Sequence, residues 1–252
     1  MSRKGNSMAF YKITHNPKYR FATLHNYGCT FRCPVCSYKL RSGENGMAGH
    51  AYPKPEQFLD NDQIKQKLMQ VDIETLFFMG GEPTVATELP ELLEFAKNTL
   101  RVRTFLGHTN GSRLPMPNLD GANVGLKAWD EKTHLEYTGR EKKPIFDNFT
   151  EAHAAGIELK ANVVYIPGFV DCDQIELIAA WLAELSPEIP FHIMAYIPVP
   201  GQYFQSPTAE QMSETVETCR KYLTYVNSSQ LSSEQALTLS KRDDRFEVKR
   251  IA

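Results

Sequence analysis

The sequence predicts an α/β fold in which six parallel strands alternate with helices. Short apolar runs recur along the chain, and most are separated by segments whose apolar residues follow helical spacing. Several of these runs end at glycine or proline, as buried parallel strands commonly do. Such alternation is typical of right-handed βαβ units, whose strands end together at one edge of a sheet. Active sites of α/β folds lie at that edge.

The predicted strands are short and mostly apolar. In chain order they are Phe21–Asn26, Ile73–Met79, Arg103–Leu106, Ala122–Leu126, Glu158–Ile166 and Phe191–Tyr196. The predicted helices lie between and after them. They cover Asp60–Gln70, Leu89–Leu100, a segment centred on Asn148–Ala155, Gln174–Leu185 and Ala209–Tyr225. Ser112–Gly121 is short and contains two prolines, so no helix is expected between the third and fourth strands.

The domain organisation follows from the absence of any change in composition before Asn227. We expect residues 1–226 to form one domain and residues 227–252 to form a C-terminal tail of unknown role. Within the tail, the spacing from Ser232 to Gln235 matches a capping box and predicts a short helix. Asp244–Ile251 has the pattern of a strand or an extended segment.

Composition excludes several classes of protein. The chain has 252 residues, of which 42% are hydrophobic and 23% charged, as in an ordinary globular protein. A formal net charge of −2 gives no reason to expect nucleic acid or an anionic membrane as a partner. No apolar run approaches the ~20 residues that span a bilayer, and no apolar signal core follows the basic N-terminus. The expected location is the cytoplasm.

The cysteines carry the strongest chemical signal. Three of the five form the spacing C-x3-C-x2-C at Cys29, Cys33 and Cys36. Three thiolates on one short loop can hold three irons of a cubane iron–sulfur cluster, which leaves the fourth iron open for chemistry. Cys172 and Cys219 have no partner at ligand spacing and are expected to be small core residues. An odd number of cysteines also argues against a disulfide framework.

A zinc site is the alternative for this loop, with His25 or His50 as the completing ligand. Structural zinc loops more often use pairs of cysteines two residues apart, and a second pair is missing here. The cysteines alone leave both readings open.

A second motif identifies a family. Gly80-Gly81-Glu82-Pro83 follows the second strand, and together with the cysteine loop after the first it resembles the radical S-adenosylmethionine (SAM) superfamily. Alone, this tetrapeptide would be read as a turn that ends a strand. The resemblance implies a partial (β/α)6 TIM-like barrel with parallel strands, an oxygen-sensitive [4Fe–4S] cluster on the three cysteines, and SAM on the open iron. It also implies that the Gly80-Gly81-Glu82 segment contacts the methionine amine.

A closer similarity extends from about Gly28 to Gly201. Leu126-Lys127, Asp130, His134, Thr138-Gly139 and Val164–Gly168 are similar to the small pyruvate formate-lyase activating enzymes, which activate glycyl-radical enzymes. By this resemblance Lys127 meets the carboxylate or ribose region of SAM, Thr109 and Asn110 line the site, and backbone near Val164 packs the adenine. Without the resemblance to this family, Lys127 could equally be a solvent-exposed lysine at the end of a strand or a cofactor contact. Val35 stands where the family usually has an aromatic residue beside the cofactor.

Several positions depart from the activating enzymes. Two aspartates of a monovalent-cation site correspond to His108 and Gly125, while an arginine and a histidine near the cofactor correspond to Asn162 and the region of Ile197. These differences concern the substrate rather than the cysteine loop. His108, which follows the third strand beside Thr109, is the candidate substrate contact.

The reaction implied by the resemblance begins with one electron delivered to the cluster. SAM is then cleaved to methionine and a 5′-deoxyadenosyl radical, which abstracts hydrogen from a substrate. A low-potential donor, flavodoxin or ferredoxin, is implied because the chain has no flavin motif or second cluster of its own. Three hypotheses follow: abstraction from a protein or peptide, abstraction from a small metabolite, or a noncatalytic iron–sulfur or zinc protein.

Overall fold

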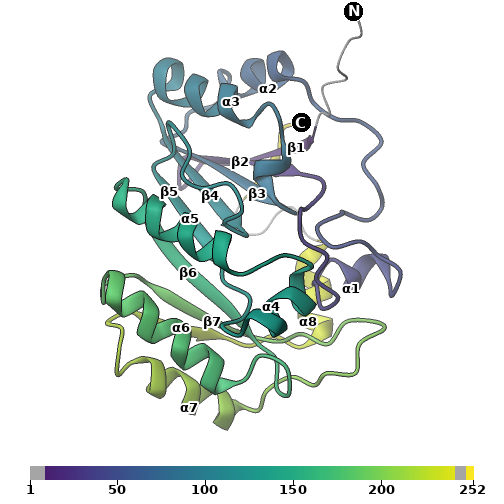
Figure 1. The fold of residues 1–252 in the computed structure, drawn as a ribbon. Coiled ribbons are helices and arrows are strands. Elements are labelled where there is room, and N and C mark those ends of the chain that lie inside the picture. Colours follow the sequence, from purple (N-terminus) through teal and green to yellow (C-terminus); the bar gives the residue numbers. More distant parts are fainter. Residues whose placement is uncertain (1–8, 242–247) are drawn as a thin grey trace, which may run out of the picture.

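The computed structural model describes residues 9–241 and 248–252, which form one nine-stranded sheet in the order β8-β7-β6-β5-β4-β3-β2-β1-β9 (Figure 1). Strands β2 to β8 run parallel, and β1 and β9 add antiparallel pairs at one edge. The strands are β1 Phe10–Asn16, β2 Phe21–Asn26, β3 Thr75–Gly80, β4 Arg103–Thr109, β5 Gly121–Gly125, β6 Glu158–Tyr165, β7 Phe191–Ala195, β8 Val226–Ser229 and β9 Lys249–Arg250. The mostly parallel, unclosed sheet confirms the predicted partial barrel.

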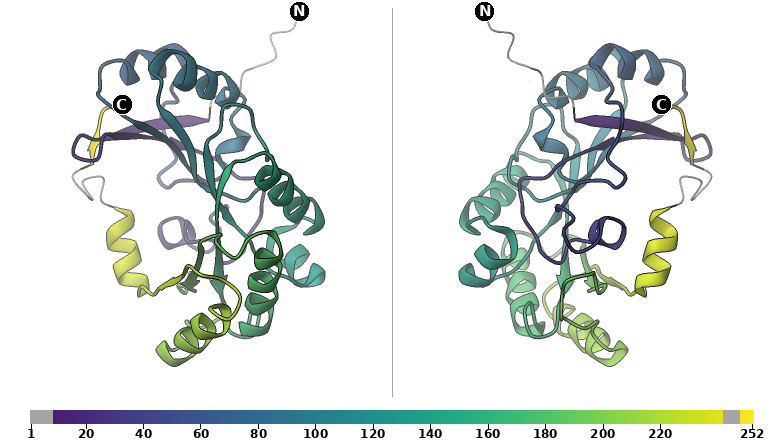
Figure 2. Two further views of the ribbon diagram at one scale, coloured as in Figure 1. Left: turned by 90° about the vertical axis from the view of Figure 1, so that its left-hand side faces the viewer. Right: turned by 90° about the vertical axis from the view of Figure 1, so that its right-hand side faces the viewer.

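Most of the helices connect the parallel strands and cover the outer face of the sheet, whereas α8 follows the last parallel strand (Figures 1 and 2). They are α1 Lys39–Ser42, α2 Asn61–Leu68, α3 Leu89–Phe95, α4 Glu131–Thr138, α5 Lys143–Ala154, α6 Cys172–Leu185, α7 Ala209–Cys219 and α8 Ser233–Ser240, with a 3₁₀ turn η1 at Pro83–Val85 and a π-helical turn η2 at Ala96–Leu100. Among the described residues, no helix is both long and apolar enough to cross a membrane.

All six predicted strands are present, and the elements that were not predicted include β1, β8 and α4. β1 combines buried Phe10 and Ile13 with polar positions, and β8 has one buried residue, so neither has the apolar run of a central strand. α4 buries His134 and Tyr137 on a mainly polar sequence, which hides its helical period. The predicted helix Ala209–Tyr225 is shorter in the structure and ends at Cys219.

The C-terminal segment 227–252 is joined to both edges of the sheet. β8, which begins one residue before the expected boundary, pairs with β7, and β9 pairs with β1 at the opposite edge. The predicted capping box of α8 is confirmed, because Ser232 Oγ accepts from the Gln235 N–H and Gln235 Oε1 accepts from the Ser232 N–H. Of the extended segment predicted for Asp244–Ile251, residues 244–247 lie outside the described part and Lys249–Arg250 form β9.

Alternate residues of β2 face opposite sides of the sheet. Ala22 and Leu24 are buried in the core, whereas Phe21, Thr23 and His25 line a cavity on the inner face. α8 lies on that inner side, away from α5, α6 and α7 (Figure 2). The chain therefore leaves one edge of the open barrel at β8, passes through α8 and reaches the other edge at β9.

Removing the cap of α7 is expected to destabilise the whole protein. Thr208 and Gln211 form a capping box, and the helix buries Met212 and Val216. Thr208→Ala should therefore lower the free energy of unfolding by about 1 kcal/mol, measured by urea denaturation. Ser232→Ala breaks the equivalent box of α8, which buries no residue, so its effect on global unfolding should be smaller. Equal losses would show that α8 unfolds together with the core.

Candidate active site

The three cysteines lie in the loop that follows β2, and backbone hydrogen bonds fix this loop at its start and between the first two cysteines. The Gly28 N–H donates to the Gly49 carbonyl at 2.9 Å, and the Arg32 N–H donates to the Thr138 carbonyl at the end of α4 at 2.9 Å. Cys33 is buried, while Cys29 and Cys36 are half-buried. The Phe31 N–H donates to Cys29 Sγ at 3.3 Å, a contact of the kind that tunes iron–sulfur clusters.

Burial raises the pKa of Cys29 and raises the pKa of Cys33 to about 12. The nearby thiols add to this effect, and the ammonium of Lys127 opposes it. The free thiols therefore stay protonated, and thiolates form here when a metal centre compensates their charge. Cys219 is buried on α7, and Cys172 is half-buried at the start of α6, so both lie on helices away from the loop.

The loop does not form a site for a single metal ion. Within residues 9–241 and 248–252, no three side chains of His, Cys, Asp or Glu are grouped so that they could hold one ion. His25 shares a hydrogen bond with Thr14 at 3.0 Å, and His50 Nδ1 bonds the Ala48 carbonyl at 2.8 Å. A cubane cluster makes a different demand, because each thiolate binds a different iron atom.

Gly80 and Gly81 allow β3 to end directly against the cysteine loop. A Cβ on Gly81 would lie 2.1 Å from the Gly28 carbonyl oxygen and 2.3 Å from that of Gly49. A Cβ on Gly80, whose φ is +131°, would lie 2.3 Å from the carbonyl oxygen of Asn26. The glycines are thus required for the contact between two backbones.

Glu82 is fully buried and its carboxylate is surrounded by donors. Oε1 accepts from the Thr84 N–H at 3.2 Å, the Thr84 hydroxyl at 2.7 Å and the Thr109 hydroxyl at 2.8 Å. Oε2 accepts from the Asn110 N–H at 2.6 Å. Burial raises the pKa of Glu82, and these donors counteract that effect. The carboxylate joins the ends of β3 and β4, and at 0% exposure it does not face a ligand space.

The residues predicted around Glu82 separate into two groups. Thr109 and Asn110 lie beside it, and Asn110 Nδ2 reaches Thr30 Oγ1 at 2.8 Å and Cys29 Sγ at 3.8 Å. Val35 is buried in the core, and Val164 is half-buried on β6. Neither valine has a described contact with Glu82 or its donors.

A second polar cluster lies over Gly125. A Cβ on this glycine would lie 2.7 Å from Lys127 Nζ and 3.3 Å from both His108 Nε2 and Asn162 Oδ1, so three side chains from β4, β6 and the end of β5 converge there. Burial and the Lys127 ammonium lower the pKa of His108 to about 3, which keeps its imidazole neutral. His108 thus faces Lys127, as expected for neighbouring strand ends.

Two groups of this cluster lack partners. Asn162 is 2% exposed and donates from Nδ2 to Asn123 Oδ1 at 2.8 Å, but its Oδ1 has no hydrogen-bond partner. Leaving such an atom unsatisfied costs about 1–3 kcal/mol. Lys127 forms no salt bridge within the part of the chain that the structure describes. A ligand with a hydrogen-bond donor and an anionic group would satisfy both.

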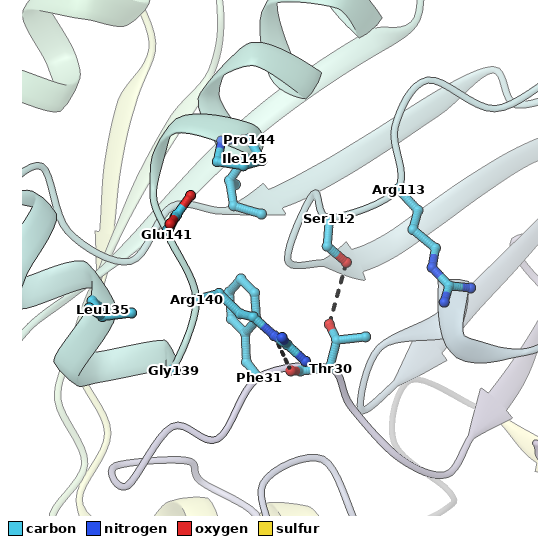
Figure 3. A pocket seen from close by; sticks show the side chains of 10 residues that line it. All are labelled: Thr30, Phe31, Ser112, Arg113, Leu135, Gly139, Arg140, Glu141, Pro144 and Ile145. Carbon is cyan, nitrogen blue, oxygen red and sulfur yellow. Dashed lines mark hydrogen bonds between the residues drawn. The ribbon is translucent and has the colours of Figure 1, made fainter.

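The structure also contains two hollows beside the cysteine loop. One is a cavity of about 580 Å³ between the inner face of β1–β3, the segment around α1, and α8. Gly80, Arg41, Ile197 and Leu239 are among its lining residues, so it reaches the glycine pair and is bounded by the C-terminal helix. The other is a groove of about 530 Å³ that includes Thr30 and Phe31 of the cysteine loop (Figure 3).

Sequence reasoning missed several residues of this site. Gly28 and Gly49 contact Gly81, and Thr84 donates twice to Glu82. Gly49 lies in a glycine-rich stretch that reads as a flexible loop, and Thr84 has no motif of its own. Asn162 was noted only as a departure from relatives, since its unpartnered oxygen is visible only in three dimensions.

Comparison with known proteins places these features in a family. The model of the radical SAM superfamily matches residues 23–180, so the chain belongs to that superfamily and is a radical SAM enzyme. Membership implies a [4Fe–4S] cluster and SAM as cofactors. A proposed glycyl-radical enzyme activating enzyme of Methanocaldococcus jannaschii is 27% identical over 219 residues, covering 82% of this chain and 80% of that protein.

Solved structures share the fold. Streptococcus suis SuiB bound to SAM superposes with a TM-score of 0.60 at 17% identity, covering 81% of this chain and 48% of SuiB. This chain therefore corresponds to about half of SuiB. A domain of a pyruvate formate-lyase activating enzyme from Bacteroides vulgatus superposes with a TM-score of 0.50 at 21% identity, covering 61% of this chain and 97% of that domain.

Adding a methyl group at Gly81 is expected to prevent the cysteine loop from closing. Gly81→Ala places a Cβ against two backbone oxygens that have no side-chain freedom to move. We expect a folded protein with less bound iron after anaerobic reconstitution, measured by iron analysis and circular dichroism. Gly156→Ala is the control, because Gly156 also has a positive φ, +79°, but no atom near the added Cβ. Full iron loading of Gly81→Ala would contradict this reading.

The imidazole of His108 is expected to remain uncharged from about pH 5 to 8. Its pKa of about 3 has two causes, burial and the positive charge of Lys127. Lys127→Met removes the second, so the pKa of His108 should rise yet stay below the ordinary value of about 6.5. Nuclear magnetic resonance of labelled histidine measures both effects. A measured pKa of the wild-type His108 ring near the ordinary value of about 6.5 would show that water reaches the group of polar side chains over Gly125.

Proposed function

We propose that Cys29, Cys33 and Cys36 hold the [4Fe–4S] cluster of this enzyme, and that it abstracts hydrogen from a segment of a peptide or protein. The observation that carries this assignment is the position of the cysteine loop, which β3 and α4 fix beside a buried polar network. A half-buried loop with an N–H donor to sulfur is the environment that such clusters use. When bound and reduced, the cluster supplies the electron that cleaves SAM into methionine and a hydrogen-abstracting 5′-deoxyadenosyl radical.

The residues over Gly125 are suited to bind SAM. The Lys127 ammonium would pair with the carboxylate or donate a hydrogen bond to an oxygen of the ribose region, and Asn162 Oδ1 would accept a hydrogen bond from a donor such as a hydroxyl. Thr109 and Asn110 would form the wall beside the cysteines. Val164 would offer its backbone to the adenine, as in the family that the sequence resembles.

Glu82 is proposed to orient the site without touching the cofactor. Its carboxylate holds the Asn110 N–H at 2.6 Å, and the Asn110 side chain in turn approaches Cys29. A charged acceptor with four donors is a rigid connection between β3 and β4. The contact with the methionine amine implied by the family motif would then come from backbone next to Glu82 rather than from its side chain.

The substrate proposal is supported by relatives and by the inner cavity. The Methanocaldococcus jannaschii relative is described as activating a glycyl-radical enzyme, and SuiB has also been solved with its precursor peptide SuiA, superposing here with a TM-score of 0.57. The cavity of about 580 Å³ is in the range that takes a small ligand or a short peptide segment. A protein substrate would therefore present an extended segment to it.

Anaerobic reconstitution with iron and sulfide tests the proposed function. We expect about four irons per chain and formation of 5′-deoxyadenosine from SAM under reducing conditions. Alanine at Cys29, Cys33 or Cys36 should abolish both the cluster absorbance and the product, because a cubane needs all three thiolates. Cys172→Ala and Cys219→Ala are the matched controls and should keep both. Loss of the cluster in either control would overturn the ligand assignment, and zinc bound in place of iron would favour the noncatalytic alternative.

A further inference from the structure

The groove beside the cysteine loop has an apolar centre and a charged rim (Figure 3). Phe31 and Ile145 lie in it, and Leu135, which is 50% exposed, stands at its edge. Arg113 and Arg140 line it from two different loops, one after β4 and one between α4 and α5. The Arg140 guanidinium lies at Thr30, whereas that of Arg113 points away from the centre toward the Thr84 carbonyl (Figure 3). An apolar centre with arginine around it is the composition of a protein-binding surface.

The arginines of the groove carry uncompensated charge. Arg113 donates to the Thr84 carbonyl at 2.7 Å and Arg140 to the Thr30 carbonyl at 3.3 Å, contacts that hold the side chains without neutralising them. Neither forms a salt bridge within the described ranges of the chain. Arg32 lies close by, since a Cβ on Gly139 would be 3.8 Å from its Cδ. Glu141 also lines the groove, so three arginines and one carboxylate leave this surface with a local positive charge in a chain whose net charge is −2.

The groove has a short connection to a cysteine sulfur. Ser112 and Thr30, both lining residues, share a hydrogen bond at 3.4 Å. Asn110 Nδ2 donates to Thr30 Oγ1 at 2.8 Å and lies 3.8 Å from Cys29 Sγ. Thr30 is also the covalent neighbour of Cys29. Hydrogen bonds and one peptide link therefore lead from the floor of the groove to a proposed cluster ligand.

We propose that this groove is the docking site of a small acidic one-electron carrier protein of the flavodoxin type. The proposal rests on the proposed function, since only a chain that holds the cluster needs such a partner. In the transfer the carrier loses one electron and the cluster gains it, with no group exchanged. Acidic residues around the carrier's redox group would pair with Arg113 and Arg140, which would bring that group over Thr30 and Phe31.

The position of the groove also separates the carrier from the substrate. Its lining comes from the cysteine loop, the loop after β4, and α4 and α5, whereas the inner cavity is lined by β1–β3, the α1 segment and α8. The two hollows have no lining residue in common. A carrier in the groove therefore leaves the substrate cavity accessible, so both partners can be bound during one turnover.

Binding of oxidised flavodoxin to the cluster-loaded enzyme tests the groove directly. Calorimetry should give a dissociation constant that rises about tenfold or more when Arg113→Glu and Arg140→Glu are combined, with smaller effects for each alone. Wild-type affinity should fall with added salt, and that of the double variant should change little. Lys221→Glu, an exposed charge reversal after α7, is the control and should bind normally. Lysine at both arginine positions should retain most of the affinity.

Reduction by photochemically reduced deazaflavin separates this proposal from the proposed function. This reductant needs no protein dock, so the double variant should form 5′-deoxyadenosine from it at the wild-type rate while flavodoxin-driven formation slows. Wild-type affinity of the double variant for flavodoxin, or no binding by the wild-type enzyme, would overturn the groove assignment. Failure of the wild-type enzyme with deazaflavin would overturn the proposed function, and the calorimetric result would still decide whether the groove binds the carrier.

Discussion

The contact between the end of β3 and the cysteine loop determines the geometry of the rest of the site. The Glu82 N–H donates to the Gly28 carbonyl at 2.8 Å, and Asn26 Nδ2 donates to the carbonyls of Gly28 and Glu82 at 3.1 and 2.9 Å. Gly81 fits between the Gly28 and Gly49 backbones with no space for a side chain. Because Gly81 packs backbone against backbone, the spacing at that point does not depend on rotamers. A shift there would displace the cysteines and Glu82 together.

Glu82 extends this contact to the neighbouring strand. Its bonds to Thr109 and Asn110 fix the end of β4, and Asn110 reaches back to Thr30 and Cys29. The cysteine loop, β3 and β4 are thereby closed into a ring of hydrogen bonds around one buried carboxylate. A buried carboxylate held by four donors is rigid, and a site for a reactive intermediate needs rigidity because its groups must be placed before the reaction begins.

The sequence predicts those features that depend on local pattern. The six central strands follow from apolar runs, and the cysteine spacing with Gly80-Gly81-Glu82 identifies the family. Features that depend on contacts between distant segments could not be predicted. Gly49 and Gly81 are separated by a helix and a strand, so their contact has no sequence signal. The burial of Glu82, the open acceptor of Asn162 and the groove formed by Thr30, Arg113 and Arg140 depend likewise on how strands and loops meet.

The C-terminal segment has a role in this arrangement that its composition does not indicate. An unclosed parallel sheet leaves a gap between its edge strands, and here α8 occupies the inner side of that gap. The helix buries no residue, and its side-chain contacts include Ser233 Oγ to the Pro198 carbonyl at 2.9 Å and Arg41 to the Ser240 carbonyl at 3.5 Å. Such an element opens at a lower free energy than the core strands. One wall of the inner cavity is therefore a helix that buries no residue, while the cysteine loop is held by backbone contacts with no space for a side chain. Under the proposed function, a substrate segment would enter the cavity past α8 without displacing the proposed cluster ligands.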